Sequence, residues 1–509
     1  MIAPRLPVVP LGTPDAPPEP SRYVSRSPGA LLLQVRTAVL VLAWVLTLLQ
    51  LAGGDSGELA ALASFPIAAA LAFLADRRYL GAMLVLCIPA LGLPDTVAPG
   101  GAAADGAGGF IIAFPDAVTF VVLGGVQVTS VLVILAAGFG RVMLEVLRRP
   151  STFRGVCPPL AVLAYAAALI PALMCALQGQ ANGLNRWSVG VRGLLAVGGF
   201  FWGVVMVRQS RGTPSDYARQ VLRVVLVGSF LAVIGILRGT YFFLLVGMTG
   251  GAFAHYLSRR RGLPATLTGA VVVGSVFVAT LTTLGEVAFA LLCMMLNGPG
   301  MRRLRRFLVR AGVATAGIMS LGLLWAVMRF SQMASFTANS RDQGLLAYAY
   351  FKLMGDRGPL WVSALEQILA GPYVIVPAGR PLHPQGIYAR LYSWEFGAHN
   401  TVLELLINNG MVAGAAGVAL IGLAIWSAAR LLIDTQDRGL RAVAAGFLGV
   451  GVVGVTTGSF PVYDVGFFLW SLGGILAALH AAELARREAE LASAGTPPAA
   501  PASRLPAFA

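Results

Sequence analysis

The residues best suited to acid–base chemistry stand at the start of a long apolar run, in the stretch HNTVLELLINNGMVAG, which begins with His399 and Asn400. A neutral imidazole is the side chain best suited to accept a hydroxyl proton near pH 7. Glu404 follows Asn400 by about one helical turn, and a carboxylate in an apolar helix calls for a partner or a function. The stretch therefore predicts a general base at the mouth of a helix.

If this stretch is one continuous helix, its small residues line up below the histidine, because positions three or four apart share a helix face. The face is predicted to carry, in order, His399, Leu403, Leu406, Gly410, Ala413 and Gly417. Small residues would allow a second helix to pack closely there.

A basic segment, residues 331–398, comes directly before the histidine. Its cationic and imidazole side chains are Arg341, Lys352, Arg357, Arg380, His383 and Arg390. Guanidinium groups bind phosphate oxygens in a bidentate manner, so this segment suits an anionic lipid headgroup, above all a diphosphate. For any single arginine, an ion pair with the segment's own acids is the alternative interpretation. Those acids include Asp342, Asp356, Glu366 and Glu395.

The elements that must position these residues are predicted to be membrane-spanning helices. Of the 509 residues, 57% are apolar and 12% are charged, and the mean hydropathy is +0.77, which is typical of an integral membrane protein. We predict an all-α, polytopic bundle of about 12–14 transmembrane helices with one long external loop. The apolar runs lie near 36–53, 58–75, 79–94, 116–139, 157–177, 191–207, 221–237, 240–257, 264–284, 285–298, 309–330, 399–427, 441–458 and 465–480.

The net charge of +15 comes from arginines clustered between apolar runs, as in the cytoplasmic loops of membrane proteins. We therefore expect contact with membrane lipids and no binding of nucleic acid. The predicted division of the chain is a disordered cytoplasmic tail (1–30), an N-terminal transmembrane bundle (31–330), an external cap (331–398), C-terminal transmembrane helices with the His-Asn motif (399–480) and a cytoplasmic tail (481–509).

The pattern H-N-T-x-L-E-x-L that starts at His399 resembles the O-antigen ligase and O-antigen polymerase family of polytopic membrane glycosyltransferases. The long preceding loop supports the resemblance, as does its stretch RGPLWVSAL from Arg357, which is followed by Gly371-Pro372 and Gly379. About residues 190 to 430 are covered. The chain departs from the family at Glu286, near which members carry a Ser-Arg pair.

The resemblance implies a GT-C-like enzyme of the bacterial cytoplasmic membrane that moves a glycan from undecaprenyl diphosphate to an acceptor hydroxyl on the outer face, with no metal and no cofactor. His399 would be the base, and Arg357 would hold the diphosphate leaving group. The other residues implied at the substrate are Arg192, Arg341, Asn400, Glu404 and Trp361. The resemblance leaves the acceptor open, and with it the choice between ligase and polymerase.

Two rival functions remain open from the sequence. Asp55 and Glu58 lie in the first predicted outer loop, where they could serve a transferase that uses a lipid monophosphate sugar, or simply cap a helix. A transporter or flippase of a glycolipid would also use many helices and a basic cavity, although such proteins usually place charges deep in their spans. The four cysteines form no C-x-x-C pair, and the four histidines are scattered, so neither predicts a metal site.

Overall fold

The computed structural model of the protein is helical at nearly every residue that it describes. The described residues are 66, 69, 121–123, 126–128, 130–178, 186–210, 212–233, 240–278, 281–296, 299–314, 317, 361, 364–365, 368, 400–454 and 463–495. Several predicted segments fall elsewhere: the tail 1–30, the spans near 36–53 and 79–94, and most of the cap 331–398 lie outside these residues.

The helices are, in chain order, α4 (Ser130–Arg148), α5 (Pro159–Gln178), α6 (Arg186–Gln209), α7 (Pro214–Val233), α8 (Thr240–Ser258), α9 (Gly262–Val278), α10 (Leu281–Met295), α15 (Thr401–Asp434), α16 (Arg438–Gly454) and α17 (Tyr463–Gly495). The remaining labelled elements are the 3₁₀ turns η3 (Pro150–Phe153) and η5 (Pro299–Met301) and the strands β1 (Val121–Leu123) and β2 (Val126–Val128). The two strands form an antiparallel pair in which Val122 lies opposite Gln127.

Local sequence signals explain where some helices begin. At the start of α7, the Thr213 hydroxyl donates to the Asp216 carboxylate at 3.0 Å, and the Asp216 amide donates back to the Thr213 hydroxyl at 3.3 Å. This reciprocal pair is a capping box, with Pro214 at the first helical position, where no amide is needed. Asp437 serves the same purpose for α16, because its carboxylate accepts the Leu440 amide at 2.7 Å.

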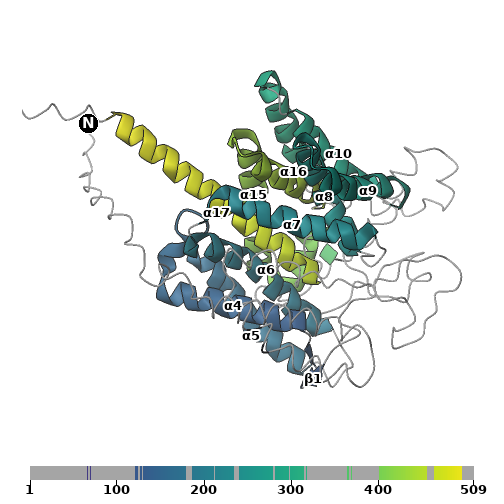
Figure 1. Ribbon diagram of the computed structural model, residues 1–509. Coiled ribbons are helices and arrows are strands. Elements are labelled where there is room, and N and C mark those ends of the chain that lie inside the picture. The colour runs from purple at the N-terminus through teal and green to yellow at the C-terminus, as the bar shows by residue number, and fades with distance from the viewer. Residues whose placement is uncertain are drawn as a thin grey trace, which may run out of the picture.

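The helices pack as two groups, and α15 joins them (Figure 1). Helices α4 and α5 pack against α6, which lies along the yellow helix α17. Helices α8, α10 and α16 pack on one another, while α7 and α9 cover α8. Helix α15 contacts α5, α6, α16 and α17, so it lies between the two groups.

Glycines allow the closest of these helix contacts. A Cβ atom added to Gly203 of α6 would collide with the backbone oxygen of Ser471 in α17, and one added to Gly474 of α17 would collide with the backbone oxygen of Phe200. Gly251 of α8 meets the backbone of Ala442 in α16 in the same way. The backbones of paired helices therefore touch directly, as small residues permit.

The prediction of a polytopic bundle of about 12–14 transmembrane helices is wrong for the described chain. Only two of its helical segments are long and apolar enough to cross a membrane: Asn409–Asp434, with a hydropathy of 1.9, and Phe468–Glu490, with a hydropathy of 1.4. The other apolar helices are shorter or less continuously apolar. At a rise of 1.5 Å per residue, the described residues of α9 (17) and α10 (15) extend about 22–26 Å, compared with about 30 Å of hydrocarbon.

The physical reason for the error is that an apolar run has two uses, crossing a bilayer or filling a protein core. Here much of the apolar surface fills a core: Phe200, Phe201 and Trp202 of α6 are fully buried, as are Leu469 and Leu472 of α17. Even the windows of the two candidate spans are 61% and 67% buried inside the protein. Hydropathy alone does not separate these two uses.

Candidate functional site

Helix α15 begins directly after the predicted base. Its cap is Asn400, whose side-chain oxygen accepts the amides of Val402 at 3.0 Å and Leu403 at 3.3 Å. These bonds satisfy amides that a helix N-terminus otherwise leaves without partners. His399 itself lies outside the described residues. Asn400, the next residue in the chain, is the N-cap of the helix.

The chain turns back on itself at Gly410, so α15 has two arms. Gly410 has φ 77° and ψ 167°, a backbone conformation that belongs almost only to glycine. A Cβ atom added to Gly414 would lie 2.6 Å from the backbone oxygen of Leu405, whereas nine residues along one straight helix span about 13 Å. The predicted continuous face from His399 to Gly417 is therefore wrong, because it is broken at Gly410.

The first arm, residues 400–409, buries an unusual number of polar side chains, and we call it the polar arm. Asn400, Thr401, Glu404 and Asn409 are all buried. The Asn409 amide group makes no hydrogen bond to any described residue through either Oδ1 or Nδ2. Buried polar groups are normally paired, so an unpaired amide indicates a partner such as water or a ligand.

A tyrosine from α5 sits in the bend between the two arms. The Tyr165 hydroxyl lies beside Asn409 in the polar arm, and an added Cβ at Gly417 in the second arm would collide with it. The hydroxyl is fully buried and lacks hydrogen-bond geometry toward any described residue. Tyr165 and Asn409 thus bring three buried polar atoms together at the closed end of the hairpin.

The structure places part of the predicted substrate site. Asn400 and Glu404 share the first turn of the polar arm, and the Glu404 amide donates to the Asn400 backbone oxygen at 2.9 Å. Arg192 lies in α6 beside Gly193, whose added Cβ would lie 3.4 Å from Asn409 Oδ1. The backbone of Arg192 therefore runs beside the far end of the arm, about 13 Å along its axis from Asn400.

Of the remaining predicted residues, Trp361 is described by the structure and the others are not. Trp361 is fully buried, as is Ala364 one turn along, so the indole packs in the protein interior. Arg357 and Arg341 lie outside the described residues, as do Asp55 and Glu58 of the rival site.

Glu286, which stands where the family resemblance expects an arginine, is not part of the polar arm. It is buried where α10 packs on α8 and α16. An added Cβ at Gly247 of α8 would lie 2.8 Å from its Oε2 atom, and one at Gly449 of α16 would lie 2.5 Å from its backbone oxygen. Gly247 thus makes room for the carboxyl group, and Gly449 lets α16 approach the backbone of α10.

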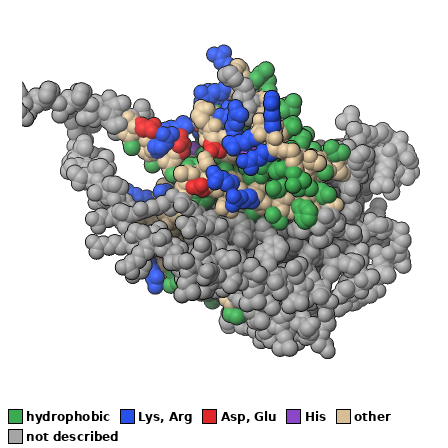
Figure 2. All heavy atoms as spheres, in the orientation of Figure 1, with side chains coloured by type: hydrophobic (Ala, Val, Ile, Leu, Met, Phe, Trp, Pro, Cys, Tyr) green, Lys and Arg blue, Asp and Glu red, His purple; other side chains and the backbone are tan. Residues whose placement is uncertain are grey.

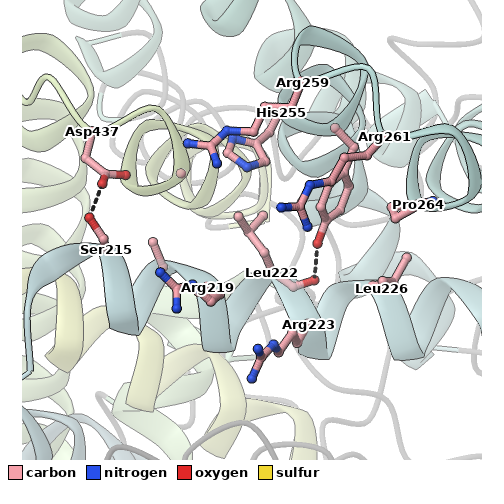
Figure 3. Close-up of a pocket in the computed structure, with 13 residues that line it drawn as sticks. Ser215, Arg219, Leu222, Arg223, Leu226, His255, Arg259, Arg261, Pro264 and Asp437 are labelled. Carbon is pink, nitrogen blue, oxygen red and sulfur yellow. Dashed lines mark hydrogen bonds between the residues drawn. The ribbon is translucent and has the colours of Figure 1, made fainter.

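A second polar site, which we call the basic pocket, lies where α7, the end of α8 and the start of α16 meet (Figure 3). Its volume is about 360 Å³. In Figure 3, Ser215 and Asp437 stand at one end, Arg261 and Pro264 at the other, and His255 and Arg259 lie between them. The lining residues are Ser215, Ala218, Arg219, Leu222, Arg223, Leu226, His255, Tyr256, Arg259, Arg261, Pro264, Asp437 and Gly439.

The only carboxylate among the described residues that line this pocket, Asp437, already accepts hydrogen bonds from the protein. Asp437 accepts a short hydrogen bond from the Ser215 hydroxyl besides the bond from Leu440 that caps α16. Burial acts to raise the pKa of Asp437, but these hydrogen bonds, one from the Gly439 amide and the charge of Arg259 hold that pKa below its ordinary value. Asp437 is therefore ionised at neutral pH and bound to the protein's own donors.

The arginines of the pocket act to lower the pKa values of its two aromatic side chains, His255 and Tyr256. Burial and the charge of Arg259 lower the pKa of His255, against a backbone hydrogen bond to Arg438 and the charge of Asp437. His255 is therefore neutral at pH 7. Burial raises the pKa of Tyr256, an effect that the charges of Arg261 and Arg223 reduce.

The sequence indicated the arginines of this pocket but not the pocket itself. Residues 259–261 are one of the arginine clusters between apolar runs that hydropathy assigns to cytoplasmic loops. One usable signal was the spacing of Arg219 and Arg223, which puts both on one face of α7. Asp437 is far from these arginines in the sequence, and only the folded chain brings it close to them. Within the part of the chain that the structure describes, no group of three or more His, Cys, Asp or Glu side chains could hold a metal ion.

Comparisons with known proteins give one limited similarity. The alignment with the tegument protein UL47 of Bovine herpesvirus 1.1 (strain Cooper) is 29% identical over 155 residues and covers 28% of this chain. The match spans 21% of the length of that viral protein. No family model matches the chain. No solved structure matches it either.

Proposed function

We propose that this protein transfers a glycan from a polyprenyl diphosphate carrier to an acceptor hydroxyl at a membrane surface. The supporting observation is the polar arm of α15: it starts directly after His399 and buries Asn400, Thr401, Glu404 and Asn409 in an otherwise apolar region. Burying polar side chains is unfavourable unless they are paired or serve a function. The arm also ends in the buried amide of Asn409, which lies beside the Tyr165 hydroxyl and has hydrogen-bonding capacity left for a bound molecule.

The proposed reaction uses residues at the open end of this arm. His399 would take the proton of the acceptor hydroxyl while that oxygen attacks the anomeric carbon of the glycan. The bond from the anomeric carbon to the carrier phosphate breaks, and the diphosphate leaves with the electron pair. Arg357, with Arg341, would neutralise the charge that develops on the diphosphate. The helix N-terminus at Asn400 adds a positive field to the same region.

Exposed apolar side chains support a location at a membrane. The second arm of α15 presents Met411 and Val412 to the surface near Gly410, and Trp426 lies exposed farther along. The guanidinium of Arg430 stacks over the Trp426 ring at 5.8 Å. Tryptophan and arginine at the end of an apolar segment are typical of helices that reach the membrane–water interface. We propose that α15 and α17 hold the protein there.

Arg357→Lys is expected to leave the protein folded and attached to membranes while removing most of the transfer activity. A lysine keeps the charge, but its ammonium group lacks the planar fork that binds two phosphate oxygens at once. The measurement is release of the carrier diphosphate by the purified variant in lipid vesicles, together with its melting temperature.

The matched control is Arg380→Lys, an equal change in the same segment at an arginine with no assigned role. This variant is expected to keep its activity. If Arg357→Lys stays fully active while Arg341→Lys or Arg192→Lys loses activity, the diphosphate is held by a different arginine from the one proposed.

A further inference from the structure

The basic pocket has more positive charge than the protein itself neutralises. Four arginines line it, Arg219, Arg223, Arg259 and Arg261, against the single carboxylate of Asp437. None of the four guanidinium groups forms a side-chain hydrogen bond or an ion pair with a described residue, although Arg302, Arg430, Arg486 and Arg487 do elsewhere. An arginine fork matches phosphate geometry, so this pocket suits a phosphate ester.

A buried imidazole in the same pocket has one ring nitrogen without a hydrogen-bond partner among the described residues. His255 is 6% exposed, and its Nδ1 atom makes no hydrogen bond to a described residue. The volume of about 360 Å³ lies within the range of about 300–1,000 Å³ that small-molecule sites occupy. The pocket therefore accommodates a phosphate with an attached polar group such as glycerol.

The exposed face of α7 extends the pocket into an apolar strip. Arg219, Arg223, Val227, Phe230 and Val233 follow one another at helical spacing and all point outward. The first two are cationic, while Val227, Phe230 and Val233 are exposed by 36%, 49% and 48%. In Figure 2, Lys and Arg side chains gather over the upper middle of the molecule, with hydrophobic side chains to the right of them.

An anionic phospholipid has this same order of chemistry, a phosphate headgroup followed by an acyl chain. We propose that the basic pocket binds the phosphate of an anionic phospholipid headgroup, with an acyl chain lying along Val227, Phe230 and Val233. Leu226 and Pro264, which line the pocket, continue the apolar strip from the phosphate site. This site is formed by α7, the end of α8 with the turn into α9, and the start of α16, and it does not depend on the transfer reaction proposed for α15.

The test is calorimetric titration of the full-length protein in a nonionic detergent. The probes are dioctanoyl phosphatidylglycerol, dioctanoyl phosphatidylcholine, glycerol phosphate and inorganic phosphate. The anionic lipid is expected to bind most tightly. Replacing both α7 arginines, Arg219→Gln with Arg223→Gln, is expected to weaken that binding by about tenfold or more, because each charge-assisted bond to phosphate is strong.

The matched control removes an equal charge from Arg148 and Arg149, two exposed arginines at the end of α4 that lie outside the pocket. Arg148→Gln with Arg149→Gln is expected to leave the affinity unchanged. Phe230→Ser is expected to weaken the lipid but not glycerol phosphate, since only the lipid reaches the apolar strip. Melting temperatures show whether each variant is folded, and Arg219→Lys with Arg223→Lys provides a second, charge-conserving pair.

Two results would overturn the proposal. Equal affinity for the lipid and for inorganic phosphate would show that the pocket serves a free phosphate compound. Equal loss of lipid binding in the α7 pair and the α4 pair would show that only the overall charge of the protein matters. Neither result bears on glycan transfer, which is measured separately.

Discussion

Replacing His399 with alanine is expected to lower the rate of glycan transfer by about two to four orders of magnitude, the usual contribution of a general base. Binding of the diphosphate donor is expected to persist, because arginines are proposed to hold it. The parent protein should also show a rise of rate with pH near neutrality, where an imidazole loses its proton, and the variant should lack that rise. Single-turnover transfer and donor affinity, measured on the same preparation, separate the two effects.

His383→Ala is the matched control, since it removes the other histidine of the segment that precedes α15. It is expected to leave both the rate and the pH dependence unchanged. Near-normal turnover of His399→Ala with the parent's pH profile would exclude His399 as the base, and Glu404 of the polar arm would then be the next residue to replace.

Gly410→Ala is expected to disrupt the hairpin of α15 and to abolish most activity. The backbone at Gly410, with φ 77° and ψ 167°, is strained for any residue with a Cβ by about 1–3 kcal/mol. Relief of that strain requires the polar arm to move away from Leu405's contact with Gly414, which would displace Asn400 and Glu404. A lower melting temperature and a loss of transfer are the two measurements.

Gly422→Ala tests whether the effect belongs to the turn. Gly422 lies in the second arm of the same helix, and a Cβ atom added there meets no atom within 4 Å. This change is expected to be neutral or to stabilise the helix by up to about 1 kcal/mol, because alanine favours helix more than glycine does. If both variants melt like the parent, the turn at Gly410 does not define the arm.

The sequence predicted where helices lie better than what surrounds them. The run near 157–177 corresponds to α5, the run near 240–257 to α8 and the run near 441–458 to α16, with shifts of a few residues at the ends. Apolar runs specify helices because either a bilayer or a core rewards burial of the same side chains. The same ambiguity made the polytopic prediction wrong, since the hydropathy of α6 is the same whether Phe200 meets lipid or α17.

The candidate sites were less predictable because they depend on contacts between distant segments. The polar character of Asn400 and Glu404 was visible in the sequence, but the break at Gly410 was not, since glycine also occurs within unbroken helical turns, as Gly422 does in the second arm of α15. The basic pocket needs Arg219 and Asp437, which are far apart in the chain, to meet. No local pattern encodes that meeting.

The most direct test of the account is formation of a new glycosidic bond by the purified protein in liposomes. The vesicles would contain a polyprenyl diphosphate-linked glycan and an excess of acceptor glycolipid, without metal or nucleotide sugar. We predict that mass spectrometry detects the extended acceptor together with released polyprenyl diphosphate, and that His399→Ala produces neither above background. Movement of the intact labelled glycolipid from one leaflet to the other, with no new bond in any preparation, would contradict the account and identify a transporter.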